Sequence, residues 1–305
     1  MTPAHHDGRR ALAAIGIALL SALFFTLTYV LNRAAATQGG HWLWTAALRY
    51  LITLPLLLPL MPLQGGIAPV WRAMRAHPAA WLGCSTVGFV AFYLFLSFAA
   101  SSGPSWLVAG SFQFTVVAGM LCAPLLYRDA RRKVPLGALG VGALIVAGVV
   151  CMQLGYAKGP LDRTAWIALA CVLASAVLYP IGNRLLLLHL ERTGEHLNAT
   201  QRVFGMTLAS QPAWVLIAAV AFAQAGSPSS QQVWLAGGVA LGAAEAMQAA
   251  ELLFAIGMGA LFLGEAWPQG VAVWGAALIV FGIVAFAWLV SRPASTQPVP
   301  EEPHA

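Results

Sequence analysis

Charged residues are scarce in this sequence. Only 9% of its 305 residues are Asp, Glu, Lys or Arg, whereas 60% are hydrophobic. In soluble domains, charged residues make up about a quarter of the chain. A water-soluble fold is therefore excluded, because so few charges could not cover its surface. The hydrophobic residues instead gather in long runs, at 11–31, 42–62, 79–99, 105–127, 134–154, 164–183, 203–224, 232–263 and 267–290.

Most of these runs are long enough to cross a bilayer as a helix, since roughly 30 Å of hydrocarbon needs about 20 residues. The sequence therefore predicts an all-α, polytopic membrane helix bundle. Its cations favour one side, because eleven lie on alternate connections (Arg9, Arg10, Arg72, Arg75, Arg128, Arg131, Arg132, Lys133, Arg184, Arg192 and Arg202). The intervening connections carry only Arg33, Lys158 and Arg163. This asymmetry predicts a cytoplasmic N-terminus in the cell inner membrane, with the basic surface contacting lipid headgroups and not nucleic acid.

Signs of catalytic or metal chemistry are also missing. The four cysteines lie inside apolar runs without metal-ligand spacing, which indicates core packing and no disulfide framework (Cys84, Cys122, Cys151 and Cys171). The sequence has no nucleotide-phosphate loop, no metal-ligand cluster and no catalytic triad. We therefore expect neither an enzyme nor a bound cofactor or metal.

The two halves of the chain resemble each other. The first run ends in Tyr29-Val-Leu-Asn32-Arg33 and the sixth in Tyr179-Pro-Ile-Gly-Asn183-Arg184. At both places we expect the helix to close, because Asn can cap a helix and Arg complements its C-terminal dipole. Five helices per half would insert the second half in the opposite orientation. Such an inverted repeat is typical of secondary transporters.

The second half is about one helix short. Arg33 and Arg184 lie 151 positions apart, but the matching prolines Pro135 and Pro268 lie only 133 apart. The difference is about the length of one membrane helix. The run 232–263 is too long for one crossing and too short for two, which predicts a stub near 230–241 and a full helix near 243–263.

These patterns predict nine full spans plus a stub in two inverted repeats. The first repeat, 1–158, holds five spans. The second, 159–291, holds four spans and the stub. The remaining residues, 292–305, are rich in Pro, Ser, Thr, Gln and Glu and are expected to form a disordered C-terminal tail.

Acids inside the apolar runs are the strongest candidates for a substrate or proton site. Glu245, Gln248 and Glu251 are spaced three residues apart, so that on a helix they share one face. A carboxylate at the centre of a membrane helix costs about 2.5–3.5 kcal/mol, and such acids often carry protons or bind substrate. The alternative is that the missing helix has moved these acids to a membrane interface, where they are merely solvated.

Four other residues could contribute to the same site. Arg49 lies seven residues inside the second run, about 10 Å deep, where it could pair with an acid, bind an anionic group, or snorkel to the interface. Gln113 is either a hydrogen-bonding link between helices or a substrate contact. Tyr29 and Tyr179 either line a cavity or belong to the interfacial aromatic belt.

The chain resembles the drug/metabolite transporter superfamily, and within it the family of putative multidrug resistance efflux transporters. The matching segments cover nearly the whole chain: Tyr29-Val-Leu-Asn32-Arg33, Trp44-x4-Arg49-Tyr50, Ser97-Phe-Ala-Ala100, Gly103-Pro-Ser-Trp106-Leu-Val-Ala-Gly110, Tyr179-Pro-Ile-Gly-Asn183-Arg184, Gln201-Arg202-Val-Phe-Gly-Met-Thr-Leu-Ala-Ser210 and Glu245-Ala-Met-Gln248-Ala-Ala-Glu251. The superfamily typically has ten helices, and the eighth is missing here between about Leu241 and Gly242. Small multidrug relatives use a glutamate in their first helix, whereas the first run here contains no acid.

The resemblance and the buried acids together predict a secondary active transporter. It would export small organic compounds, drugs or metabolites, in exchange for protons through Glu245 or Glu251. Its partners would be a small-molecule substrate, protons and the lipid bilayer, with a homodimer left open. Two alternatives remain: a transport-incompetent membrane scaffold or decayed paralogue, and an exporter of one specific metabolite such as an amino acid.

Overall fold

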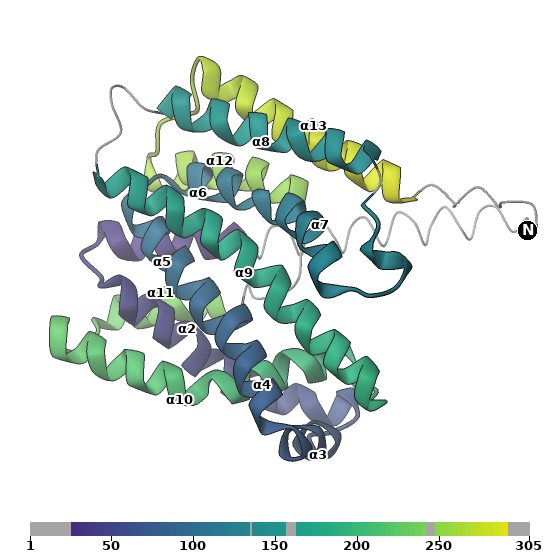
Figure 1. Ribbon diagram of the computed structural model, residues 1–305. Helices are drawn as coiled ribbons and strands as arrows, with labels where there is room; N and C mark the ends of the chain where they lie inside the picture. The colour runs from purple at the N-terminus through teal and green to yellow at the C-terminus, as the bar shows by residue number, and fades with distance from the viewer. Residues whose placement is uncertain (1–25, 135, 157–162, 242–247, 292–305) are drawn as a thin grey trace, which may run out of the picture.

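A computed structural model describes residues 26–134, 136–156, 163–241 and 248–291, and these residues form helices joined by short connections, without strands (Figure 1). The all-α prediction is confirmed. Six stretches are long and apolar enough to cross a membrane: Trp42–Gln64, Pro78–Ser102, Ser105–Leu126, Leu136–Tyr156, Arg163–Thr193 and Ala199–Ala225. Two shorter apolar helical segments, Phe254–Leu263 and Val271–Ala285, lie nearer the C-terminus. The chain is a multi-pass membrane protein, and the number of nine spans stays a prediction.

The first half begins with a helical segment at residues 26–37. The elements that follow are α2 (Trp42–Leu57), the 3-10 segment η1 (Leu58–Gln64), α3 (Ala68–Ala76), α4 (Pro78–Ser85), the π-helical segment η2 (Thr86–Ala91), α5 (Phe92–Ser102), α6 (Ser105–Phe112), α7 (Phe114–Leu126), η3 (Ala130–Arg132) and α8 (Leu136–Tyr156). The third apolar run therefore folds as one continuous rod, α4–η2–α5. The fourth run divides at Gln113 into α6 and α7.

The second half contains α9 (Arg163–Thr193), α10 (Ala199–Ala225), α11 (Ser230–Leu241), α12 (Gln248–Leu263) and α13 (Val271–Ser291). The bounds of α11 match those of the predicted stub. Its described part has 12 residues, about 18 Å as a helix. The described part of α12 has 16 residues, about 24 Å, and the beginning of the full helix expected near 243–263 lies outside the described residues.

Two predicted helix ends are wrong. The first helix continues past Arg33 to residue 37, and α9 continues past Arg184 to Thr193. Intrahelical hydrogen bonds do not need an apolar sequence, so a helix can extend into the polar region beyond the bilayer. The connection between α9 and α10 is therefore limited to residues 194–198, and Asn198 and Gln201 form a capping box that fixes the start of α10.

The helices stack into a layered bundle (Figure 1). Helices α8 and α13 lie side by side along one edge, and α10 lies at the opposite edge with α2 beside it, while α11 packs against α2. Between these edges, α5 packs against α9, and α6 against α12. Contact is most extensive between α8 and α13, where a Cβ atom added to Gly148 would lie 2.7 Å from the carbonyl oxygen of Gly275. Such backbone contact is the small-residue packing found between membrane helices.

The outer surface of the bundle is apolar. Leu63, Leu125, Leu136 and Trp234 are each more than 80% exposed. Large apolar side chains in these positions would be costly in water but are favourable against lipid. The interior, in contrast, combines large aromatic side chains with several polar ones, and this interior holds the candidate site.

Candidate functional site

Arg49 on α2 lies inside the bundle, with only 4% of its surface exposed. Its guanidinium carbon lies 4.0 Å from the ring centre of Tyr93 and 5.2 Å from that of Tyr50. The Nε and Nη1 atoms have no hydrogen-bond partner among the described residues, and no described carboxylate lies within ion-pair distance. Burying an ion costs several kcal/mol, and a ring contact returns about 0.5–2 kcal/mol. Within the described part of the chain, Arg49 is therefore a buried charge without a neutralising partner, and it does not snorkel.

Arg49 adjoins a group of aromatic side chains that we call the aromatic cluster. Its rings touch in a continuous series, with neighbouring centroids 4.7–6.2 Å apart. They come from residues 26–37, α2, η2, α5, α6, α9 and α10, so both halves contribute. The members of the cluster are Tyr29, Tyr50, Phe89, Phe92, Tyr93, Phe112, Tyr179 and Trp214.

The ring contact with the shortest centroid distance in the cluster joins the two halves. Tyr50 on α2 stacks on Trp214 on α10, with centroids 4.7 Å apart and planes 6° from parallel. The indole Nε1 of Trp214 is buried and has no acceptor among the described residues. A buried indole N–H usually finds an acceptor, so this group is an unused donor on a ring that stacks on Tyr50, the neighbour of Arg49.

A second unused donor lies on the first helix. The Tyr93 hydroxyl donates a hydrogen bond to Oδ1 of Asn32 at 3.0 Å, which orients the amide. The Nδ2 group of Asn32 then has no partner among the described residues, although Asn32 is only 3% exposed. Asn32 is therefore part of the polar interior and does not cap a helix end. Asn183 does not cap either, because its Nδ2 donates to the Tyr179 carbonyl within α9 at 2.9 Å.

The π-helical segment η2 brings α5 against the second half. Gly88 in η2 meets Gly182 in α9 so closely that a Cβ atom on Gly182 would overlap the Gly88 backbone. The segment packs against α4, α5, α9 and α10 and contributes Phe89 to the aromatic cluster. Single π-helical turns occur often at functional sites. At this turn the backbones of η2 and α9 touch, and the ring of Phe89 contacts that of Tyr50.

Gln113 lies at the break between α6 and α7 and is fully buried. Its Nε2 donates to the Ala109 carbonyl within its own helix at 3.2 Å, so it does not link helices through this group. Its Oε1 has no donor among the described residues. The preceding residue, Phe112, belongs to the aromatic cluster. Gln113 therefore places an unused acceptor beside the cluster, at an interrupted helix of the kind found in transporter sites.

The structure brings together Arg49, Tyr29 and Tyr179, with Gln113 adjacent. It does not show where the predicted acids point. Glu245 lies outside the described residues, and Gln248 and Glu251 are placed only as backbone in the first turn of α12. Their relation to Arg49 therefore stays a prediction.

A charged group at one end of the bundle was not anticipated. Glu265, which follows α12, accepts hydrogen bonds from the backbone N–H of Ser105 at 2.8 and 3.0 Å and from its hydroxyl at 2.6 Å. This carboxylate thereby satisfies the N-terminus of α6. Arg33 approaches the same carboxylate at 3.9 Å and donates to the Ser101 carbonyl at 2.8 Å. The contacts of Glu265 with Arg33 and Ser105 therefore connect the first helix and the start of α6 to the second half.

Asp129 follows α7 in the first half, as Glu265 follows α12 in the second. Its carboxylate lies 2.7 Å from Nη2 of Arg131, which also reaches Glu191 on α9 at 2.9 Å. The hydrogen bonds from Arg131 hold the pKa of Asp129 below its ordinary value. These side chains are about half exposed, so the group is a solvated contact between α9 and the loop before α8.

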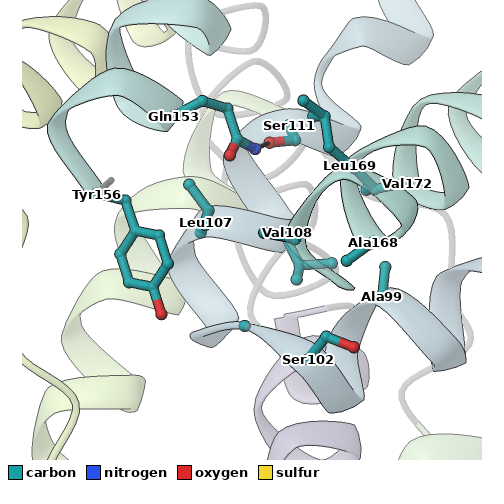
Figure 2. A pocket seen from close by; sticks show the side chains of 12 residues that line it. Ala99, Ser102, Leu107, Val108, Ser111, Gln153, Tyr156, Ala168, Leu169 and Val172 are labelled. Carbon is teal, nitrogen blue, oxygen red and sulfur yellow. Dashed lines mark hydrogen bonds between the residues drawn. The ribbon is translucent and has the colours of Figure 1, made fainter. Parts of the chain in front are cut away.

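A small cavity lies elsewhere, between α5, α6, α8 and α9 (Figure 2). Its volume is about 40 Å³, enough for one or two water molecules and too small for an organic substrate. In Figure 2, Gln153 on α8 points toward Ser111 on α6, and its Nε2 donates to the hydroxyl at 2.8 Å. The cavity is therefore a packing feature and not the candidate site.

Several of these residues could not be identified from the sequence. Tyr93, Trp214 and Phe89 lie within apolar runs, where an aromatic ring looks like ordinary packing. Tyr50 adjoins Arg49 in the sequence, which could have suggested its role. Glu265 sits just beyond a run and looks like a loop acid. The one sequence feature that could have identified Glu265 is its position just after the fourth helix of its half, which Asp129 shares in the first half.

Comparison with known proteins places the chain in a family. Residues 12–242 match the family described as EmrE, putative multidrug resistance efflux transporter. The uncharacterized protein YjlA of Bacillus subtilis (strain 168) is 35% identical over 304 aligned positions, covering 89% of this chain and 93% of that protein. Because 89% of 305 residues is about 271, some 33 of those positions are gaps in this chain.

Two further similarities extend this result. An uncharacterized 42.1 kDa protein in the intracellular alkaline protease 3′ region of Shouchella clausii is 38% identical over 225 positions, covering 72% of this chain but only 58% of that protein. A solved structure titled "Crystal structure of protein" has a TM-score of 0.50 and 14% identity, covering 91% of this chain and 97% of its own, which supports the fold alone. By the family match and by its apolar helices, the chain belongs to the EmrE family of putative multidrug resistance efflux transporters, as a multi-pass membrane protein.

Proposed function

We propose that this chain is a secondary active transporter of the cell inner membrane, with a cytoplasmic N-terminus, that exports small organic compounds. The observation that carries the proposal is the buried charge of Arg49 beside the aromatic cluster, which has no carboxylate partner among the described residues. A membrane protein that only had to fold would be more stable with an apolar residue there. The cluster draws on helices of both halves, which is where transporters built from repeats bind their substrates.

The contacts between helices support a repeat of two halves related by a two-fold exchange, which is the first requirement of the proposed inverted repeat. If the halves are exchanged, residues 26–37 correspond to α9, α2 to α10, α4 to α11, α6 to α12, and α8 to α13. The pairs α2–α10, α6–α12 and α8–α13 then map onto themselves, and the contact of α4 with α10 maps onto that of α11 with α2. We propose that residues 1–158 and 159–291 are these repeats.

The same correspondence indicates where the second half is shorter than the first. In the first half the rod α4–η2–α5 covers Pro78–Ser102, 25 residues, whereas α11 has 12. The family match ends at residue 242, one residue beyond the last described residue of α11, and the alignment with YjlA leaves some 33 positions without a counterpart in this chain, more than one membrane helix needs. These findings support a deletion of the eighth helix between Leu241 and Gly242. The deletion is also the reason to retain the transport-incompetent scaffold as a second candidate function.

Transport can be tested directly with the purified chain in proteoliposomes. We expect accelerated flux of at least some members of a panel of organic cations, organic anions, amino acids and neutral drugs, relative to protein-free vesicles. Flux equal to that of empty vesicles for the whole panel would favour the scaffold. A reporter fused after Ala305 tests the topology independently: a periplasmic reporter indicates nine crossings and a cytoplasmic one indicates ten.

Proton coupling through Glu245 or Glu251 is a separate part of the proposal. We expect an imposed pH gradient to drive flux in the wild type but not in the double variant Glu245→Gln, Glu251→Gln. Glu195→Gln, in the connection before α10, is the matched control and should behave as wild type. Unchanged pH-driven flux in the double variant would remove both acids from the coupling mechanism.

A further inference from the structure

We propose that Arg49 is an anion-binding residue, and that the compound bound at the aromatic cluster is an organic monocarboxylate with an apolar or aromatic body. This inference names the substrate class of the proposed exporter and rests on that function only for transport. Binding of the carboxylate is a distinct property that can be measured without flux.

The unused polar groups around the cluster are mainly donors. Arg49 offers Nε and Nη1, Trp214 offers Nε1, and Asn32 offers Nδ2, all buried and without partners among the described residues. Trp214 is connected to Arg49 through the ring of Tyr50, and Asn32 through that of Tyr93. Each such donor favours a ligand that brings acceptor oxygens. A carboxylate brings two oxygens and no proton of its own.

The charge of the site fixes the charge of the ligand. Arg33 already contacts Glu265, and Arg184 donates to the Gly119 carbonyl, so Arg49 is the free cation beside the cluster in the part of the chain that the structure describes. One carboxylate neutralises one guanidinium and can accept charge-assisted hydrogen bonds from it. A phosphate dianion would leave an excess negative charge in a low-dielectric interior, which is costly. The balance therefore favours a monoanion.

The rings argue against a cationic ligand and for an apolar body. An aromatic face can bind a cation, but here Arg49 already lies over the face of Tyr93 at 4.0 Å. A second cation beside it would be repelled. The remaining rings, among them Tyr50, Phe89 and Trp214, supply apolar and stacking surface of the kind that lines small-molecule sites. Because Arg49 is 4% exposed, the described conformation is closed, and the ligand would enter through a rearrangement of the helices.

The test is ligand binding by the full chain in lipid nanodiscs, measured as thermal stabilisation and by titration. The probes share one body and differ in charge: 3-phenylpropanoate, its neutral amide 3-phenylpropanamide, and the cation 3-phenylpropylammonium. We expect the carboxylate to bind at least tenfold more tightly than the amide or the cation. In Arg49→Gln its affinity should fall about 10- to 100-fold, as expected for loss of a charge-assisted hydrogen bond. Arg75→Gln, an exposed arginine that also lies over a ring, is the matched control and should bind as wild type.

Three results would overturn the proposal. The first is preference for the cation or the amide, and the second is equal carboxylate affinity in wild type and Arg49→Gln. The third is a structural partner for Arg49: if Arg49→Gln unfolds and adding Glu251→Gln restores both folding and wild-type affinity, the arginine serves an internal ion pair. Carboxylate binding without flux in proteoliposomes would sustain the anion site and refute export. Flux of cations unaffected by Arg49→Gln would sustain export and refute the anion site.

Discussion

Replacing Arg49 by methionine should stabilise the ligand-free protein. The arginine loses several kcal/mol of hydration when buried, and its two ring contacts, over Tyr93 and Tyr50, each return about 1–2 kcal/mol. Methionine has a similar length, fills the same space and carries no charge. We therefore expect Arg49→Met to raise the free energy of unfolding by about 1–3 kcal/mol, within the gain of up to about 4 kcal/mol seen when buried ion pairs are replaced by apolar residues.

The measurement is reversible unfolding in mixed micelles, supported by thermal denaturation, in which a few degrees of increase would correspond to this energy. Arg33→Met provides the contrast, because it removes the cation 3.9 Å from Glu265 and should lower stability. If Arg49→Met destabilises the protein as much as Arg33→Met does, Arg49 has a structural partner, and the reasoning that treats it as a ligand-binding charge is wrong.

Two further variants test the packing around the site. Gly182→Ala places a methyl group into the Gly88 backbone and should lower the unfolding free energy by about 1–3 kcal/mol. The control Gly83→Ala, with open space around it, should leave the unfolding free energy unchanged. Equal effects of the two variants in a denaturation assay would contradict the close contact. Glu265→Ala removes the acceptor for the Ser105 N–H and should lower the unfolding free energy by about 1–3 kcal/mol. Ser105→Ala keeps that N–H and loses only the hydroxyl, so it should lower the unfolding free energy by less. The reverse order would show that the hydroxyl is the more important contact.

Much of the fold follows from the sequence because bilayer thickness fixes helix length. Hydropathy located the spans from α2 to α10 and the short α11, since each hydrophobic run must satisfy its own backbone within lipid. It misplaced the end of α9, because residues such as Arg184 and Arg192 remain helical after leaving the apolar layer. It also gave no sign of the break at Gln113, since a single residue with slightly altered backbone angles leaves the hydropathy unchanged.

The candidate site was only partly predictable for a related reason. Arg49 stands out because charge is rare in an apolar run, and Tyr29 and Tyr179 stand out because they repeat in the two halves. Trp214 and Tyr93 have no such distinguishing sequence feature. They join the site only because helices that are far apart in the chain meet there. The acids at Glu245 and Glu251 remain sequence predictions, as their side chains lie outside the described part of the protein.

The backbone contact between α8 and α13 limits how this bundle can move. With Gly148 pressed against Gly275, the two helices have almost no side-chain layer that could slide or repack. We therefore expect α8 and α13 to move as one unit, and a path to Arg49 to open by rotation of the remaining helices about this pair. Spin labels on α8 and α13 should keep their separation when the ligand is added, whereas labels on α2 and α10 should change theirs.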